Sequence, residues 1–263
     1  MRCNDSDLRE KKCRFFVCVS LAASGDRSGL AKLQKSYPLA AGSLAGRELD
    51  LEDVANHLHG IGSILDHLQK LPSLVGIAID GPLLITNDSG QRKCETLIGK
   101  KYGSRKASCH TSNLSLFPDA DSAGLSSALG ARGFNHLGAR LSKWQIECYP
   151  HPALIEVFNL AERLNYKKGP IGDRRRGQCQ LADLLLGLSK SDVLRLSVPD
   201  RFSHFFKPSH IESLRGVALK HNEDVLDAVI CLYVGGLYAS GISEHVFGDA
   251  VNGYIYVPQV RCI

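Results

Sequence analysis

The chain has 263 residues, of which 44% are hydrophobic and 22% charged, so it can bury a full core and we expect a soluble globular protein. No stretch approaches the roughly 18 uninterrupted apolar residues of a membrane helix. The charged N-terminal segment lacks a signal-peptide pattern, and the net charge is a mild +5. We therefore expect a cytoplasmic protein that does not bind membranes.

Strands and helices alternate along the chain. Short apolar runs bounded by glycine or proline predict strands, and apolar residues at spacings of three and four predict helices. The predicted strands cover residues 15–21, 30–34, a short segment within 42–49, 75–80, 143–149 and 254–257. The predicted helices cover residues 51–71, 91–102, a region inside 122–141, 152–163, 178–188, 210–219 and 223–238. This order predicts a single α/β domain with a mostly parallel sheet beyond an initial antiparallel meander.

The first candidate site residue ends the strand written VGIAIDGPL. Alternation places Gly76, Ala78 and Asp80 on one face, so small side chains there would let a helix or a ligand come close. Ligands of open α/β sheets bind beyond the carboxyl ends of strands, which is where Asp80 stands. An aspartate before Gly-Pro is also a good turn former, and this stretch alone leaves both interpretations open.

A second carboxylate lies in the segment WQIECYPHP. Glu147 sits in the middle of an apolar strand, opposite in phase to Ile146 and Cys148. The pattern predicts either a further acid for the same site or a residue facing solvent or a surface arginine, since an edge strand would expose it.

The segment HNEDVLDAVICLYVGG predicts a buried helix with acids at its start. Asn222 suits the N-cap, and the positive end of the helix dipole explains Glu223 without any further role. Asp227 lies one turn beyond Asp224 on the same face. A carboxylate entering an apolar helix is costly unless a cation meets it, so these two aspartates indicate a cation site.

Together the acids offer the oxygen ligands that Mg²⁺ or Mn²⁺ prefers. Two such ions about 4 Å apart can hold a phosphodiester between an attacking water and a leaving oxygen. The predicted metal ligands are Asp80, Asp224 and Asp227, with Glu147 as a further catalytic acid.

The nine cysteines, an odd number in a chain without a secretory signal, predict reduced thiols. Zinc is the alternative, for which the nearest ligand pairs are Cys109 with His110 and Cys148 with His151. Neither pair has the CxxC type of spacing of a structural zinc site, so the thiol interpretation is preferred.

Basic residues gather in pairs and in one triplet, mostly beside glycines, and such clusters suit a phosphate backbone. Each pair also has a plain explanation as solvated surface. The clusters are Arg92-Lys93, Lys100-Lys101, Arg105-Lys106, Lys167-Lys168 and Arg174-Arg175-Arg176. The triple arginine is the least ordinary of them, and we expect nucleic acid, DNA or RNA, as a partner.

The order of a meander, a helix, a strand ending in acid and a late helix carrying acids resembles the ribonuclease-H-like fold. The segments VGIAIDGPL, RKCETLIGKKYG, IECYPHPAL, YKKG and EDVLDAVIC, with Ser112-Asn113, resemble the predicted-nuclease family called domain of unknown function 429. The second half is similar to Holliday-junction resolvases of the RuvC type, which work as dimers, so a homodimer is also expected. The resemblance spans about residues 15–258 and leaves residues 1–13 as a flexible tail.

This resemblance implies one ribonuclease-H-like domain over residues 1–263, with helical insertions, a mixed sheet and helices on both faces. It assigns metal ligation to Asp80, Asp224 and Asp227, with Glu147 as a further member. With the basic clusters it gives the predicted substrate-binding residues Arg92, Lys100, Lys101, Ser112, Asn113, Arg174, Arg175 and Arg176.

The first strand departs from the pattern of these families, which begins Gly-Ile-Asp-Leu-Ala. Here the matching segment reads CVSLAA, and Ser20 stands where the central metal-binding aspartate belongs. A serine hydroxyl is a neutral, weak ligand for Mg²⁺, and loss of the bridging carboxylate impairs two-metal catalysis. Asp26 follows in the turn and is not equivalent.

Three alternative functions are compatible with these sequence features. The first is a metal-dependent nuclease or phosphodiesterase acting on nucleic acid. The second, favoured by Ser20, is a catalytically impaired relative that binds nucleic acid or protein. The third and weakest is an ATP-handling protein of the actin and sugar-kinase type, with the turn over residues 25–29 as its phosphate loop, although that turn lacks a close glycine-rich pattern.

Overall fold

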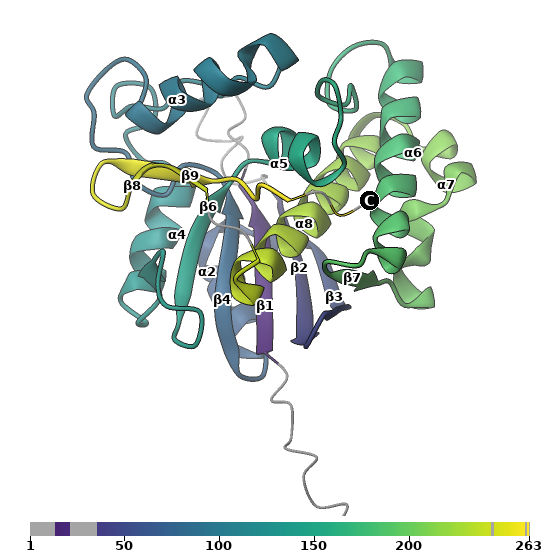
Figure 1. The fold of residues 1–263 in the computed structure, drawn as a ribbon, viewed down its shortest axis with the longest axis horizontal. Helices are drawn as coiled ribbons and strands as arrows, with labels where there is room; N and C mark the ends of the chain where they lie inside the picture. The colour runs from purple at the N-terminus through teal and green to yellow at the C-terminus, as the bar shows by residue number, and fades with distance from the viewer. Residues whose placement is uncertain (1–13, 22–35, 243–244, 261, 263) are drawn as a thin grey trace, which may run out of the picture.

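One mixed sheet organises the protein (Figure 1). The structure, a computed structural model, describes residues 14–21, 36–242, 245–260 and 262, without the side chains of Arg14 and Ser20. The predicted tail over residues 1–13, the predicted strand over 30–34, the turn over 25–29 and Asp26 lie outside these residues. The strands are β1 (Arg14–Ser20), β2 (Ser36–Ala45), β3 (Glu48–His59), β4 (Leu74–Asp80), β5 (Asn135–His136), β6 (Trp144–Cys148), β7 (Arg195–Ser197), β8 (Val246–Asp249) and β9 (Gly253–Tyr256).

The strand order is β7-β3-β2-β1-β4-β6-β9-β8, with β5 beside β6. β1, β2 and β3 form an antiparallel meander, and β4 and β6 continue the sheet in parallel from β1. The predicted fold class is therefore confirmed as a mixed sheet of antiparallel and parallel strands with helices on both faces. This arrangement is consistent with a ribonuclease-H-like fold.

Helices cover both faces of the sheet because strand residues alternate between two apolar cores. Phe16 and Cys18 of β1 face the core that contains α8 (Gly216–Ser240), α5 (Pro150–Val157) and α6 (Ile171–Gly187). Val17 and Val19 face the core that contains α2 (Gly60–Gln69) and α4 (Asp121–Gly130). A third core joins α3 (Lys93–Tyr102) to β8 and β9, and Figure 1 shows α3 above these two strands.

The predicted helix over residues 51–71 is wrong in its first half, which continues β3 to His59. Pairing with β2 explains this result, because the long antiparallel ladder overrides the local helical pattern. The turn between the two strands is at Gly46, whose φ of 65° favours glycine. Only Gly60–Gln69 is helical, with Ile64 and Leu68 buried.

Other helix ends also differ from the prediction. α5 stops at Val157, six residues early, and Asn159 adopts a φ of 51° just beyond it. α6 begins at Ile171, which places the triple arginine in its first turns. The predicted helices over 210–219 and 223–238 are instead α7 (Pro208–Ser213) and a continuous α8 from Gly216. The short strands β5, β7 and β8 were not predicted, and the remaining short helices are η1 (Gly103–Arg105), η2 (Leu188–Lys190) and η3 (Asp200–Phe206).

All seven cysteines in the described part of the chain are free thiols, as predicted. Over the same residues, none of the helices combines the length and the apolar character needed to cross a membrane.

Candidate functional site

Asp80 ends β4 between two parallel neighbours. Its backbone pairs in register with Ser20 of β1 and with Cys148 of β6, and its side chain is buried. The predicted close approach of a helix to its face is confirmed, since a Cβ added at Gly235 of α8 would lie 3.4 Å from the Cβ of Ala78. The small residues of β4 thus bring α8 against the strand that carries Asp80.

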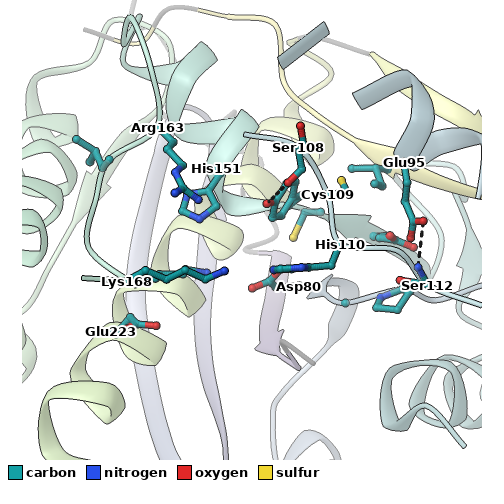
Figure 2. A pocket seen from close by; sticks show the side chains of 18 of the residues that line it. Asp80, Glu95, Ser108, Cys109, His110, Ser112, His151, Arg163, Lys168 and Glu223 are labelled. Carbon is teal, nitrogen blue, oxygen red and sulfur yellow. Dashed lines mark hydrogen bonds between the residues drawn. The ribbon is translucent and has the colours of Figure 1, made fainter. Parts of the chain in front are cut away.

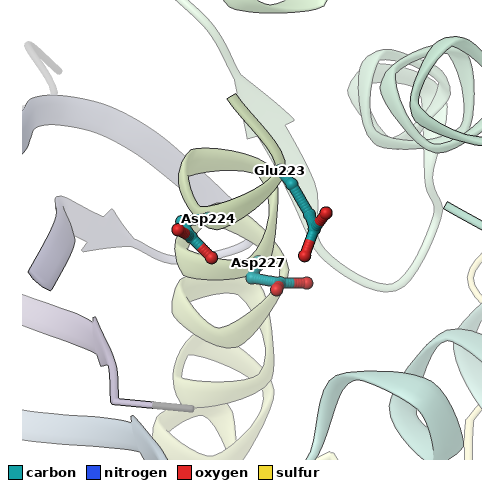
Figure 3. A group of neighbouring side chains, drawn as sticks. All are labelled: Glu223, Asp224 and Asp227. Carbon is teal, nitrogen blue, oxygen red and sulfur yellow. The ribbon is translucent and has the colours of Figure 1, made fainter. Parts of the chain in front are cut away.

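Three acids of α8 form a compact cluster (Figure 3). One carboxylate oxygen from each of Glu223, Asp224 and Asp227 lies within 4.8 Å of the others. Glu223 and Asp227 are buried, and Asp224 is partly buried. We call these three residues the α8 cluster.

The start of α8 corrects the predicted cap. The N-cap is Arg215, so Asn222 lies inside the helix, where its amide donates to Gln178 Oε1 at 3.1 Å. Glu223 therefore lies beyond the first turn, and the helix dipole does not explain it, because that effect fades within the first turn. Glu223 belongs to the acidic cluster and was missed as a site residue.

Basic side chains from two segments meet the α8 cluster. Lys167 Nζ lies 2.8 Å from Asp227 Oδ2, and Tyr166 donates a hydrogen bond of 2.6 Å to Asp227 Oδ1. Lys220 Nζ lies 2.8 Å from Glu223 Oε1 and also pairs with Asp224. Arg174 of the triple arginine adds a contact of 3.3 Å to Glu223 Oε2.

The electrostatics of the site follow from burial of several charges together. Burial raises the pKa of Asp80 well above its usual range; Lys167 opposes this shift and Asp227 adds to it. Burial also raises the pKa values of Glu223 and Asp224, with Lys220 opposing. Burial alone would lower the pKa of Lys167, but Asp227 and Asp80 raise it above its ordinary value. Lys167 therefore stays charged at neutral pH.

A pocket of about 360 Å³ opens above Asp80. Figure 2 shows Arg163 and Lys168 on one side of it and Asp80 and His110 on the other. Lys167, Lys220 and Glu223 also line it, so the pocket adjoins the α8 cluster. It is bounded by the loop through Ser108 and by residues 163–168, two segments that are far apart in sequence.

Glu147 and Arg92, predicted as a catalytic acid and a substrate-binding residue, are paired with each other. Two hydrogen bonds of 2.6 and 2.9 Å join the guanidinium to the Glu147 carboxylate, which also accepts the Leu83 N–H. Arg92 Nε donates to Glu95 at 2.9 Å, and all three charged side chains are buried. This arginine network forms part of the lining of the pocket and holds the loop after β4 in place.

Ser112 and Asn113 are also engaged in local structure. The Ser112 N–H donates to Glu95 Oε2, and Asn113 bonds the Gly90 carbonyl and the Leu116 N–H. Ser112 lines the pocket through this loop.

The other predicted basic residues lie outside the lining of the pocket. Lys100 and Lys101 are exposed at the end of α3. Arg175 donates to the Leu214 carbonyl, and Arg176 pairs with its neighbour Asp173.

The sequence signal for the missed residues was present but weak. YKKG resembles a family motif and Lys167-Lys168 is a basic pair, but neither pattern places these lysines beside the acids. Lys167 contacts Asp227 across 60 positions, and nothing local encodes that contact. The four residues of the zinc alternative, Cys109, His110, Cys148 and His151, all line the pocket. Among the residues that the structure describes, however, the α8 cluster is the group whose ligand atoms converge.

The fold and the site define a mixed α/β protein with buried acids at the carboxyl ends of its central strands. A family described as a protein of unknown function, DUF429, matches residues 39–252, and the chain belongs to this family. Searches of curated proteins and of solved structures gave no match.

Proposed function

We propose that the protein is a metal-dependent phosphodiesterase that acts on nucleic acid, with Mg²⁺ or Mn²⁺ as cofactor. The observation that carries this proposal is the meeting of carboxylates and several cations at one pocket, which Asp80 and Glu223 line and which the rest of the α8 cluster adjoins. The acids are Asp80, Glu223, Asp224 and Asp227. Hard divalent cations bind such oxygen-rich sets, and basic side chains attract phosphate.

The residues present fit a divalent cation. The α8 cluster offers three oxygens within 4.8 Å of one another, and Asp227 Oδ2 is a buried oxygen whose partner is the ammonium of Lys167, 2.8 Å away. Lys220 is half-exposed, so its flexible side chain can turn toward solvent and leave its acids to a cation. When bound, the metal would neutralise charge on a phosphoryl group and favour attack by water.

Other side chains would bind and orient the substrate. Arg163 and Lys168 present positive charge to phosphoryl oxygens, for which guanidinium and ammonium groups are well suited. The Tyr166 hydroxyl fixes the orientation of Asp227 through its hydrogen bond. The arginine network holds the loop after β4, because Glu147 accepts the Leu83 N–H while Arg92 donates to the Leu84 carbonyl.

A cleavage assay tests this proposal. The full chain is incubated with Mg²⁺ or Mn²⁺ and labelled single-stranded, duplex and branched DNA and RNA. We expect hydrolysis that EDTA abolishes and that Asp227→Asn reduces on the order of 100-fold or more, since losing a group that stabilises transition-state charge costs about this much. The matched control is Asp183→Asn, which makes the same change at an exposed aspartate of α6. Absence of cleavage on every substrate with both ions contradicts the proposal.

A second function is favoured by the first strand. Ser20 pairs in register with Asp80, so a neutral residue occupies the β1 position at which the resemblance expects an acid. We propose as the alternative a nucleic-acid-binding or protein-interaction module without hydrolysis. An inert wild type combined with metal-dependent cleavage by Ser20→Asp supports this alternative; cleavage by the wild type that is lost in Asp227→Asn supports the enzyme.

A further inference from the structure

The size of the pocket restricts what can reach Asp80. Its volume of about 360 Å³ is at the lower end of the roughly 300–1,000 Å³ of small-ligand pockets. The pocket therefore matches a single nucleotide-sized molecule.

The charge of the pocket favours an anion. Arg163 and Lys168 line one wall and have no carboxylate within ion-pair distance among the described residues. Lys167 and Lys220, by contrast, are already paired with acids of α8. Arg163 and Lys168, which have no ion-pair partner among the described residues, are suited to bind a phosphate group, which carries up to two negative charges.

His151 supplies an independent indication of a ligand. Its side chain lines the pocket and is only 6% exposed, and its Nδ1 is buried without a hydrogen-bond partner in the described structure. The ring packs edge-on against Tyr149 and Tyr166, with centroids 5.7 and 5.5 Å away, so its position is fixed. Buried polar atoms are nearly always satisfied, and a ligand oxygen or hydroxyl would satisfy this nitrogen.

The remaining lining is apolar and aromatic. Pro82, Leu164 and Ile255 contribute apolar surface, and Tyr149 contributes a ring. The Tyr149 hydroxyl donates to the Ser108 carbonyl at 3.0 Å, which holds the ring in place at the pocket. Aromatic rings stack on nucleobases without regard to sequence.

We infer that the pocket binds one nucleotide unit, either a free nucleotide or the unpaired end of a strand, with its phosphate at Arg163 and Lys168. His151 would bond an oxygen of the same unit, and Tyr149 with the apolar residues would contact its sugar and base. The inference rests on the proposed function for the role of the acids, but the binding itself requires no turnover.

Calorimetric titration of the full chain in EDTA tests this binding. The ligands are adenosine 5′-monophosphate, inorganic phosphate and adenosine, and the competitors are a duplex with single-stranded overhangs and a duplex closed by loops at both ends. We expect the monophosphate to bind, adenosine to bind at least about tenfold more weakly, and Arg163→Gln and Lys168→Gln each to weaken the monophosphate about tenfold, or about 1.4 kcal/mol. The matched controls, Arg132→Gln and Lys190→Gln, remove exposed charges elsewhere and should leave binding unchanged.

The competitors distinguish the two sources of the nucleotide. Competition by the overhang duplex indicates a strand end, and its failure beside good monophosphate binding indicates a free nucleotide. Two results overturn the inference: no binding of the monophosphate, or binding that the pocket variants do not change. Metal-dependent cleavage without nucleotide binding would refute this inference and leave the proposed function intact. Nucleotide binding without cleavage would support this inference and contradict the proposed function.

Discussion

Two groups of buried acids lie close together in this protein, and they differ in their counter-ions. Glu147 and Glu95 are held by one buried arginine through hydrogen bonds of 2.6 to 2.9 Å. The α8 cluster is met mainly by the lysines Lys167 and Lys220. The planar guanidinium fixes its carboxylates in one geometry, whereas an ammonium on a flexible stem can move away.

Under the proposed function, this difference separates a structural role from a metal-binding one. The arginine network is closed, because its charges and the neighbouring backbone groups satisfy one another. Both groups contribute to the lining of the pocket, but in the α8 cluster the buried Asp227 Oδ2 is held by an ammonium rather than by a guanidinium. Under the proposed function, the first group stabilises the fold and the second binds a metal ion, and the following predictions test that division.

The largest effect is expected in the arginine network. Arg92→Ala leaves Glu147 and Glu95 buried without their counter-ion, which should reduce the free energy of unfolding by about 3–5 kcal/mol. Urea denaturation measures this loss. The control Arg132→Ala, at an exposed arginine, should change it by less than about 0.5 kcal/mol. A loss below about 1 kcal/mol for Arg92→Ala would show that the network is not structural.

Binding of Mg²⁺ should stabilise the folded protein, and this stabilisation should depend on the α8 cluster and not on the arginine network. At a concentration 100 times its Kd, Mg²⁺ should raise the free energy of unfolding by about 2.7 kcal/mol. Asp227→Asn should abolish this increase. Glu147→Gln should lower the free energy of unfolding without metal, but Mg²⁺ should still raise it by the same amount. Denaturation curves with and without Mg²⁺ measure both, and an increase that survives in Asp227→Asn would contradict the metal assignment.

The pocket should make stability depend on pH through His151. Burial lowers the pKa of His151 well below its ordinary value, and Lys167, Arg163 and Lys168 lower it further. Because the pKa is lower in the folded than in the unfolded protein, stability should fall as pH decreases below about 6.5, by up to about 1.4 kcal/mol per pH unit.

His151→Gln tests this effect in unfolding measurements from pH 7.5 to 5. The acids with raised pKa values act in the opposite direction but are present in both proteins, so the difference between wild type and variant isolates His151. His59→Gln, at an exposed histidine, is the control. Equal pH dependence of wild type and His151→Gln would refute the prediction.

The smallest effect is expected at Lys220. Lys220→Gln removes an ammonium that competes for Glu223 and Asp224, so Mg²⁺ should bind more tightly, by up to about tenfold. Because the Lys220 side chain is 49% exposed, the free energy of unfolding should change by less than about 1 kcal/mol in this variant. Calorimetric titration with Mg²⁺ measures the affinity, with Lys190→Gln as control. Weaker binding in Lys220→Gln would mean that this lysine supports the site.

Much of the fold could be predicted from local patterns. β4, α3, β6 and the apolar part of α8 have strong apolar runs and clear breaks, and they lie where expected. The first half of the segment over residues 51–71 could not be predicted, because its conformation depends on pairing with β2. The start of α8 was placed too late because Asn222 has the chemistry of a cap although it serves inside the helix.

The sequence by itself determined that acids end a central strand and enter a buried helix, that basic residues gather in clusters, and that Ser20 replaces the expected first acid. Only the tertiary structure decided which cation meets which acid. Glu147 and Asp227 are both carboxylates within apolar segments of the sequence, yet Arg92 meets one and Lys167 the other. Each partner comes from a distant segment, so long-range packing decides which counter-ion each buried carboxylate has, and local sequence patterns do not encode it.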